Sequence, residues 1–318
     1  MNYDVLFTPF KIGRMEVKNR IVMSPMGTLM ANRDGTFSEN EIAYYEERAR
    51  GGTGMIICGQ GYLNSDFGQG VLGHAWDHYH VVPAARGLTE RLHGYGCKAV
   101  MQLSCGTGRN ANEIHGKLPI SASENTWVWD PKVKCHALTI EEIAEMMKLW
   151  EYSAGLVRDA GFDAIEVHGD RLVGSLCSAI LNQRTDEYGG SFENRVRYAL
   201  EVVAAIKEAA PQLMVEYKLP VIMENPDGTP RGKGGLQPDE ACEFAKLLEG
   251  AGIDMIQVAQ ANHTGNMGDT IPSMGAMPYN WTLPVAERVK ALVSVPVATV
   301  GRVVSVEAGE KILEDGAA

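Results

Sequence analysis

Short runs of apolar residues alternate along the chain with longer stretches in which apolar and polar residues recur at helical spacing. The apolar runs are nearly continuous and are bounded by Gly, Pro or charged residues. Seven of them predict strands at residues 20–24, 54–58, 98–103, 164–168, 214–219, 254–259 and 297–300. Strands that are buried on both faces and separated by helices are typical of a parallel sheet.

The stretches between these runs predict the helices of the fold. They lie at residues 38–50, 84–94, 140–160, 193–209, 238–251 and 284–292, and a last helix ends at Gly316. Ser38 is expected to cap the first helix, with Glu41 completing a capping box, and Thr139 is expected to cap the third. The regular spacing, with no GxGxxG turn after the first strand, favours an α/β fold of the (β/α)8 TIM-barrel class over an open sheet. Because only seven units can be counted, we expect a single domain over residues 1–318 that stops before the eighth strand.

Composition narrows the possible partners and compartment. The chain has 318 residues, 45% of them hydrophobic, and a net charge of -11 with no basic run, so no nucleic-acid partner is expected. No apolar stretch reaches the roughly 18 residues that span a bilayer, and the start lacks a signal-peptide pattern, so a cytoplasmic protein without a membrane partner is expected. Six cysteines without a CxxC pair predict reduced thiols, with no disulfide frame and no metal site.

Candidate chemistry lies at the carboxyl ends of the predicted strands, where barrels of this class place their active sites. These ends carry no nucleophile–base pair of the hydrolase kind and no close carboxylate cluster for a metal. They carry amide, backbone and cationic groups, which suit a flat, phosphate-bearing ligand with polar edges. The candidate site residues are Pro25, Met26, Gly27, Thr28, Gly59, Gln102, His168, Asp170, Arg171, Lys218, Gly301 and Arg302.

A flavin would use such groups. Gln102 can match the donors and acceptors of the pyrimidine edge, and Lys218 can stabilise the negative charge that the reduced ring carries near N1. Gly301 suits a phosphate that is bound by backbone N–H groups. Simpler interpretations exist, since Gln102 can satisfy loop backbone and His168 can be a hydrogen-bonded core histidine. Lys218 is the hardest to explain otherwise, because an unpaired interior cation is costly.

Three segments carry a family resemblance. LFTPFKIGRMEVKNRIVMSPMGT near the start, MQL in the third strand and RTDEYGGSFENR after the fourth closely resemble the old yellow enzyme family. The nearest branch contains 2,4-dienoyl-CoA reductases, enoate reductases and bile-acid-inducible flavin oxidoreductases. The resemblance implies an FMN-bearing (β/α)8 barrel that reduces activated carbon–carbon double bonds. It also implies that Pro25, Met26, Gly27, Gly59, Gln102, Lys218 and Gly301 line the flavin, with Thr28 and Arg302 beside them.

The substrate side departs from the family pattern. Members commonly carry a histidine, then a histidine or asparagine that holds a substrate carbonyl, then a tyrosine that donates a proton. Here His168 is kept, but Arg171 and Val173 fill the other two places. The resulting segment, HGDR, resembles that of the gut-bacterial bilirubin reductases of this family, which convert bilirubin to urobilinogen.

That resemblance suggests roles for the residues of this segment. An arginine fork can pair a bilirubin propionate or polarise a lactam carbonyl. An aspartate can give up a proton near neutral pH if its pKa is raised. We therefore predict Asp170 as the acid and Arg171 as the clamp, with His168 as the third catalytic residue. In the alternative interpretation, Asp170 and Arg171 pair with each other or with the loop and only shape the mouth of the barrel.

The resemblance also bears on cofactors and partners. It implies FMN as the cofactor, NAD(P)H as the electron donor and a small-molecule alkene as the partner, and it leaves homo-oligomerisation or an electron-transfer partner open. Longer relatives add the eighth strand, an iron–sulfur centre, and FAD and nicotinamide domains, which are expected here only if the chain is longer. Three interpretations remain: reduction of bilirubin; reduction of an enoate, 2,4-dienoyl-CoA or steroid enone; or binding of a flavin or tetrapyrrole without catalysis.

Overall fold

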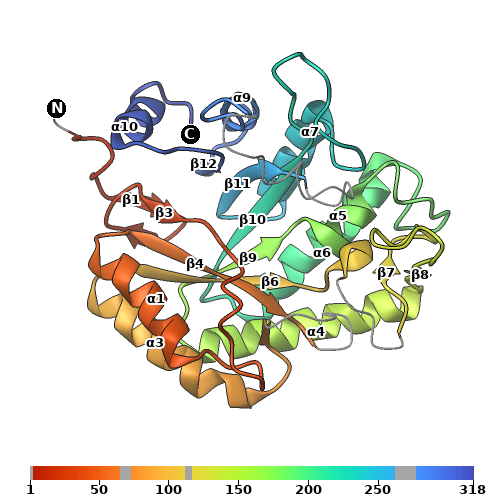
Figure 1. Cartoon of the computed structure of the whole chain (residues 1–318), viewed down its shortest axis with the longest axis horizontal. Coiled ribbons are helices and arrows are strands. Elements are labelled where there is room, and N and C mark those ends of the chain that lie inside the picture. Colours follow the sequence, from red (N-terminus) through yellow and green to blue (C-terminus); the bar gives the residue numbers. More distant parts are fainter. Residues whose placement is uncertain (1–2, 65–72, 112–116, 262–276) are drawn as a thin grey trace.

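A curled parallel sheet forms the centre of the molecule (Figure 1). The computed structural model describes residues 3–64, 73–111, 117–261 and 277–318. The strand order is β12-β11-β10-β9-β6-β4-β3, and a short strand β5 (His74–Ala75) pairs with the end of β4. The main strands are β3 (Val22–Met23), β4 (Met55–Tyr62), β6 (Lys98–Ser104), β9 (Ala164–His168), β10 (Met214–Val221), β11 (Met255–Gln260) and β12 (Val297–Thr299). All seven strands predicted from the sequence are confirmed, each next to its neighbours in chain order.

Helices cover the outer side of this sheet (Figure 1). They are α1 (Glu39–Arg50), α3 (Val82–Gly94), α4 (Ile140–Asp159), α6 (Phe192–Ala209), α7 (Pro238–Gly250) and α9 (Leu283–Lys290). The last helix, α10 (Val306–Glu314), lies beside the amino-terminal segment, where Glu310 accepts hydrogen bonds from the amides of Val5 and Leu6. The Thr139 side chain accepts a hydrogen bond from the Glu142 amide and caps α4, as predicted. None of the helices in the described ranges combines the length and the apolar character that crossing a membrane requires.

The predicted capping box at the start of α1 is only half present. Ser38 accepts a hydrogen bond from the Glu41 amide, as expected for an N-cap. The Glu41 carboxylate, however, does not turn back to Ser38, because it is buried and accepts hydrogen bonds from Thr28 Oγ1 at 2.5 Å and from His74 Nε2 at 3.1 Å. These bonds tie the loop after β3 to α1 and to the start of β5. Glu41 Oε2 and His74 Nδ1 have no hydrogen-bond partner among the described residues.

The curled sheet is not closed within the described residues. Strands β3 and β12 form its two edges and face each other across a groove of about 900 Å3. Val22 and Ser24 line one side of the groove, and Val297 and Thr299 line the other. The architecture is therefore the expected α/β barrel class with seven strands, as predicted.

The amino-terminal end of the barrel is covered by a hairpin that the sequence pattern did not predict. Strands β1 (Phe10–Ile12) and β2 (Met15–Val17) pair antiparallel, and Ile12, Met15 and Val17 pack under the sheet in one buried cluster. The cluster is completed by Met55, Ile57, Val100, Ala164, Met214 and Met255 from β4, β6, β9, β10 and β11. Because side chains two residues apart along a strand point to the same side, this apolar floor fixes which residues above it face the barrel interior.

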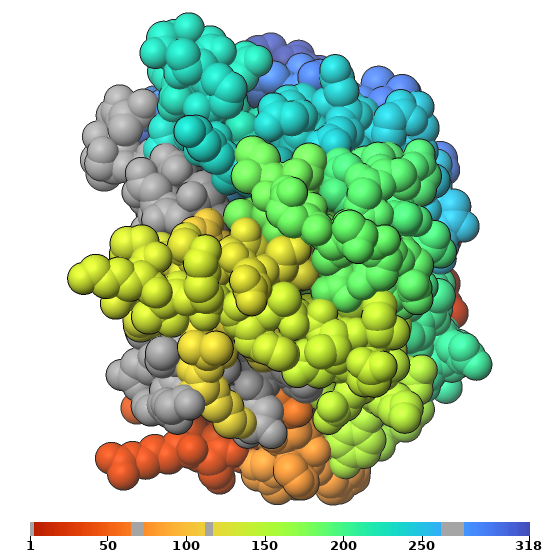
Figure 2. Space-filling model, turned by 90° about the vertical axis from the view of Figure 1, so that its right-hand side faces the viewer, coloured from red at the N-terminus to blue at the C-terminus, as the bar shows by residue number. Residues whose placement is uncertain are grey.

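The connections after β6 and β9 form a further layer over the carboxyl ends. The β6 connection contains a 3-10 helix, η2 (Gly108–Asn110), and a parallel pair, β7 (Ile120–Ser121) and β8 (His136–Ala137). A second 3-10 helix, η1 (Tyr79–Val81), precedes α3. Residue His168 is followed by a short helix, α5 (Arg171–Cys177), where a loop was expected. In Figure 2 the yellow surface of the β6 connection lies next to the green surface of the α5–α6 region.

Candidate functional site

The ends of β3, β4 and β6 are packed closely together. Gly27 and Gly59 form a parallel bridge, and a Cβ atom on Gly59 would lie 2.9 Å from both Gln102 Oε1 and Pro25 Cβ. A Cβ atom on Gly27, by contrast, would meet nothing within 4 Å. Gly59 is therefore required for the close approach of neighbouring strands, whereas Gly27 borders open space. Met26 is 49% exposed beside this space.

A polar layer lies directly above the apolar floor of the barrel. On each strand, the residue two positions after a floor residue also faces the barrel interior. For the floor residues Val100, Ala164, Met214 and Met255, these next residues are Gln102, Glu166, Glu216 and Gln257. All four of these side chains are buried. One step higher, His168 on β9 lies opposite Lys218 on β10, which in turn lies opposite Gln257 on β11. The sequence-predicted residues Gln102, His168 and Lys218 are thus brought together on neighbouring strands.

Two carboxyl groups meet in this layer. Glu166 and Glu216 lie directly opposite each other in the β9–β10 register, and Gln102 Nε2 donates to Glu166 Oε1 at 2.5 Å. Burial raises the pKa of Glu166 to about 7, and burial together with the neighbouring Glu166 raises the pKa of Glu216 well above its usual range. The positive charge of Lys218 acts in the opposite direction on the pKa of both groups.

The sequence survey of the strand ends did not include this pair of glutamates. They lie one step below the ends, inside the barrel. The signal was present in the sequence: the segments IEVH and VEYK each place a glutamate two residues before a site residue, within an otherwise apolar strand. No group of three or more His, Cys, Asp or Glu side chains suited to a metal occurs in the part of the chain that the structure describes.

Asp170 and Arg171 lie at the beginning of α5. The Asp170 side chain is buried, and its Oδ1 accepts a hydrogen bond from the Arg171 amide at 2.8 Å, so it acts as the N-cap of this helix. Arg171 has a φ of +59°, in the left-handed region that residues other than glycine rarely adopt. Its side chain is half-buried, and its positive charge lowers the pKa of Tyr62 at the end of β4, although burial raises that pKa more strongly. Tyr62 was not singled out from the sequence.

Gly301 and Arg302 follow β12 on the other side of the groove. A Cβ atom on Gly301 would lie within 3.0 Å of the Thr282 and Trp281 side chains, so no larger residue fits there. Arg302 also has a positive φ, +60°, and its guanidinium donates to the Met277 carbonyl and lies 4.9 Å from the centre of the Tyr279 ring. Both predicted site arginines therefore occupy strained backbone positions next to strand ends, a feature that often accompanies function.

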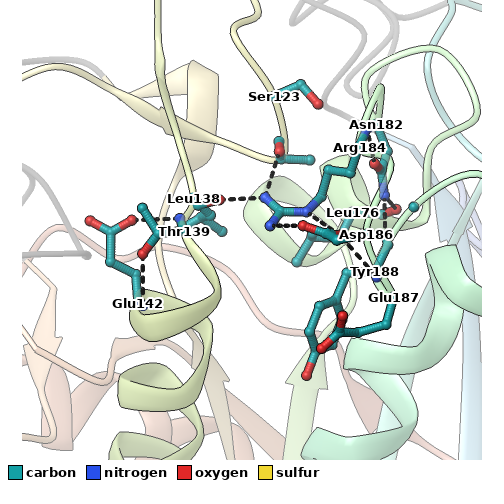
Figure 3. Close-up of polar contacts among 12 residues, drawn as sticks. Ser123, Leu138, Thr139, Glu142, Leu176, Asn182, Arg184, Asp186, Glu187 and Tyr188 are labelled. Atoms are coloured by element: carbon teal, nitrogen blue, oxygen red, sulfur yellow. Dashed lines mark hydrogen bonds and ion pairs between the residues drawn. The ribbon is translucent and has the colours of Figure 1, made fainter.

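The RTDEYGGSFENR segment has a structural role (Figure 3). Arg184 forms a two-point ion pair with Asp186 and donates to the carbonyls of Ala122 and Leu138 in the β6 connection. The Asn182 side chain donates to the carbonyls of Leu176 and Tyr188. These contacts join α5 and the following loop to the connection after β6, so the most distinctive sequence motif supports the mouth of the barrel and does not line its interior.

The groups at the rim fit an isoalloxazine ring. Open space borders Gly27. Gln102 on β6 and Lys218 on β10 lie on either side of β9, where they pair in register with Glu166 and His168. Among the buried glutamine side chains of the described protein, two atoms lack a hydrogen-bond partner, the donor Gln60 Nε2 and the acceptor Gln257 Oε1. Polar edges of a bound ring could satisfy such atoms, since buried polar groups are normally hydrogen-bonded. Some predicted residues already have protein partners: the Thr28 hydroxyl donates to Glu41, and the Gln102 amide donates to Glu166.

Comparison with known proteins gives relatives of similar sequence and similar fold. The chain is 41% identical to a bilirubin reductase of Mediterraneibacter gnavus over 98% of its length, and 35% identical to a cinnamate reductase of Clostridium sporogenes over 94%. A solved structure of 2-naphthoyl-CoA reductase superimposes with a TM-score of 0.87 at 23% identity, over 99% of this chain and 49% of that one. The chain covers 48% and 47% of the two curated relatives, so it spans about half their length.

The family itself follows from a match over nearly the whole chain. The model of the NADH:flavin oxidoreductase / NADH oxidase family matches residues 5–318. This range includes every strand of the sheet and all the site residues described above. The chain therefore belongs to the NADH:flavin oxidoreductase / NADH oxidase family.

Proposed function

We propose that this chain binds FMN at the carboxyl ends of its strands and reduces activated carbon–carbon double bonds, with bilirubin as the substrate. The observation that carries the proposal is the end of β9. There His168 lies opposite Lys218, and Asp170 and Arg171 follow at once at the start of α5. One strand end thus supplies groups for the cofactor side and for the substrate side. The 41% identity to a bilirubin reductase supports the choice of substrate.

Bound FMN would supply the hydride, and NAD(P)H is the proposed source of its electrons. On the protein side, Lys218 would hold a positive charge against the pyrimidine edge of the ring, and Gln102 would hydrogen-bond that edge. Gly27 and Gly59 would let the backbone approach, and Gly301 with Arg302 would hold the phosphate. These roles depend on groups that are already held in place by neighbouring strands, which reduces the cost of ordering them on binding.

Arg171 and Asp170 would act on the substrate. A guanidinium can form two parallel hydrogen bonds with a propionate or polarise a lactam carbonyl, and the left-handed backbone of Arg171 sets the direction of its side chain. Asp170 would hold the proton that the reduced alkene receives. Its bond to the Arg171 amide fixes the orientation of its carboxyl group.

A second candidate substrate is an aryl enoate. The cinnamate reductase relative supports it, and Arg171 could pair the carboxylate of such a substrate as it would pair a propionate. The two candidates differ in size and in the number of double bonds offered. The whole protein's further domains, including an iron–sulfur centre or an FAD site, are proposals that depend on the part of the relatives outside this chain.

The test is a half-reaction. Purified protein loaded with FMN is reduced anaerobically and mixed with bilirubin or with cinnamate, and reoxidation of the flavin is followed by its absorbance. We expect bilirubin to reoxidise the flavin faster than cinnamate does. Arg171→Ala is expected to keep the FMN spectrum but to slow this step by about 10²-fold or more. Arg197→Ala, which removes an exposed arginine from α6, is the matched control and should behave as the wild type.

The result that would refute the proposal is equally direct. If FMN binds and is reduced but neither alkene reoxidises it, the chain is not an ene reductase for these substrates. If Arg171→Ala reoxidises as fast as the wild type, the residue is not the clamp. Failure to bind FMN at all would favour a chain without redox function.

A further inference from the structure

The Glu166–Glu216 pair lies between the apolar floor and the proposed flavin site, and the proposed function gives it no role. The two glutamates are 0% and 3% exposed and lie directly opposite each other on adjacent strands. Their carboxyl groups are within hydrogen-bonding reach of each other. Glu166 Oε1 accepts from Gln102, whereas Glu166 Oε2 and Glu216 Oε1 have no donor in the described protein. A proton between the carboxyl groups is the donor that this arrangement lacks.

The charges around the pair are few. Lys218 lies one inward step above Glu216 on β10, and His168 lies one inward step above Glu166 on β9. The neighbouring strands β6 and β11 contribute the neutral amides of Gln102 and Gln257, and β4 contributes apolar Ile57. Below the pair, the floor and the β1–β2 hairpin are apolar. The charges that act on each carboxyl group are therefore those of the other carboxyl and of Lys218.

Two ionised carboxylates side by side in this setting would be strongly disfavoured, because each lacks water and repels the other. Two protonated carboxyl groups would remove the negative charge below Lys218, whose side chain is partly buried. One proton on the pair removes both problems, since the remaining negative charge then balances the lysine.

We propose that Glu166 and Glu216 share a single proton at neutral pH, and that this acid–carboxylate pair is the counter-charge of Lys218 and sets how strongly Lys218 attracts a negatively charged ligand above it. The effect on the cofactor depends on the proposed function. If the ring of bound FMN gained negative charge near Lys218 on reduction, that charge would balance the lysine, and the pair would take up a second proton from solvent. The pair is thus a positioning element that couples proton uptake to the charge of the ring.

The first test uses the protein without FMN and does not depend on catalysis. Infrared spectra of the wild type near neutral pH are expected to show the C=O stretch of a protonated carboxylic acid, shifted by exchange into D2O. Glu216→Gln should remove this band, because the amide supplies a fixed donor to Glu166 in place of the proton. Glu243→Gln, which changes an exposed glutamate on α7, is the control and should keep the band. A wild type without the band, or a Glu216→Gln protein that keeps it, would overturn the shared proton.

The second test measures the midpoint potential of bound FMN against pH. For a two-electron couple each additional proton adds ~30 mV per pH unit to the slope. Near neutral pH, the midpoint potential of the wild type should change with pH more steeply than that of Glu216→Gln, by up to ~30 mV per pH unit. The slope of Glu243→Gln should equal that of the wild type. Equal slopes in all three proteins would overturn the coupling to the flavin. Since the potential is measured without an alkene, failure of the proposed ene reduction is detected separately, by the half-reaction described above.

Discussion

Replacing Arg184 with alanine tests whether the most distinctive motif of the chain is structural. The Arg184 side chain is only 7% exposed, and its guanidinium contacts three partners at once (Figure 3). Nε and Nη2 bond the two oxygens of Asp186 at 3.0 and 2.6 Å, while Nη1 donates to the carbonyls of Ala122, at 3.1 Å, and Leu138. Alanine at this position removes every one of these hydrogen bonds and leaves two carbonyls of the β6 connection without their charged donor.

The expected cost follows from these contacts. A hydrogen bond to a charged group contributes about 1.5–3 kcal/mol, so the two carbonyl bonds together contribute about 3–6 kcal/mol if neither carbonyl is rehydrated. The Asp186 carboxylate is 30% exposed and can regain water, so its ion pair adds at most ~1 kcal/mol. Allowing for partial rehydration, we expect Arg184→Ala to lower the free energy of unfolding by about 3–5 kcal/mol. Arg184→Lys keeps the charge but not the fork, and should cost less than alanine.

The assay is equilibrium unfolding in urea, followed by circular dichroism and by tryptophan fluorescence. Arg197→Ala is the matched control, because this arginine on α6 is exposed and should contribute ~1 kcal/mol or less. A pH series adds an independent check. The Arg184 hydrogen bonds lower the pKa of Asp186, so the pair stabilises the fold above the ordinary carboxyl pKa and loses this contribution as pH falls through the lowered value. The difference between wild type and variant should therefore narrow in acid.

Two outcomes would refute this reasoning. An Arg184→Ala protein as stable as Arg197→Ala would show that the contacts in Figure 3 do not hold the β6 connection in place. A normal unfolding curve combined with loss of FMN or of alkene reduction would mean that Arg184 acts on the ligand itself. Only the second result would place Arg184 in the site itself.

Three further predictions concern the site. Gly59→Ala places a Cβ atom 2.9 Å from Gln102 Oε1 and Pro25 Cβ, so the strand ends must separate, and a fluorescence titration of the protein with FMN should show affinity reduced by about tenfold or more. Lys218→Met removes the positive charge that lowers the pKa of the buried acid pair, so the carboxylic-acid infrared band should persist to higher pH than in the wild type, and an unchanged titration would contradict this. Asp170→Ala should lose the cap of α5 and about 1 kcal/mol of stability, whereas Asp170→Asn should keep the cap. If Asp170 is also the acid, both variants should slow alkene reduction. An Asp170→Asn protein that reduces the alkene at the wild-type rate would limit the residue to capping.

The seven main strands could be predicted because each is a nearly unbroken apolar run between turn residues. The β1–β2 hairpin could not, since its strands have three residues each and one exposed charge apiece, too short to show a period. Helix α5 was missed for the opposite reason. Six of its seven residues are buried, so it has no polar face to give a helical pattern, and only Asp170 as N-cap marks its start.

The candidate site divides in the same way. Residues at strand ends could be found one by one, because a polar residue that ends an apolar run is visible in the sequence. The spacing of Glu41 from Ser38 predicts a capping box. In the structure the Glu41 side chain instead turns inward and bonds Thr28 and His74. The sequence shows that Arg171 is a charged residue after a strand. It does not show the left-handed backbone of Arg171, which the turn from β9 into α5 imposes.

The acid pair shows what strand register adds to a sequence pattern. The inward-facing residues of β9 are Ala164, Glu166 and His168, and those of β10 begin with Met214 and Glu216. In sequence alone, each strand therefore only becomes more polar toward its carboxyl end. Only the pairing of the two strands turns two separate glutamates into neighbours. Among the described residues, the hairpin and the apolar floor cover the lower end of the barrel, and Gln257 beside the pair also lines the groove. We therefore expect a proton to reach the pair from the rim or from this groove. A ligand bound at the rim would lie on one of these two routes. It would change the electrostatic environment of the two glutamates, and it would also change the rate at which they exchange their proton with solvent.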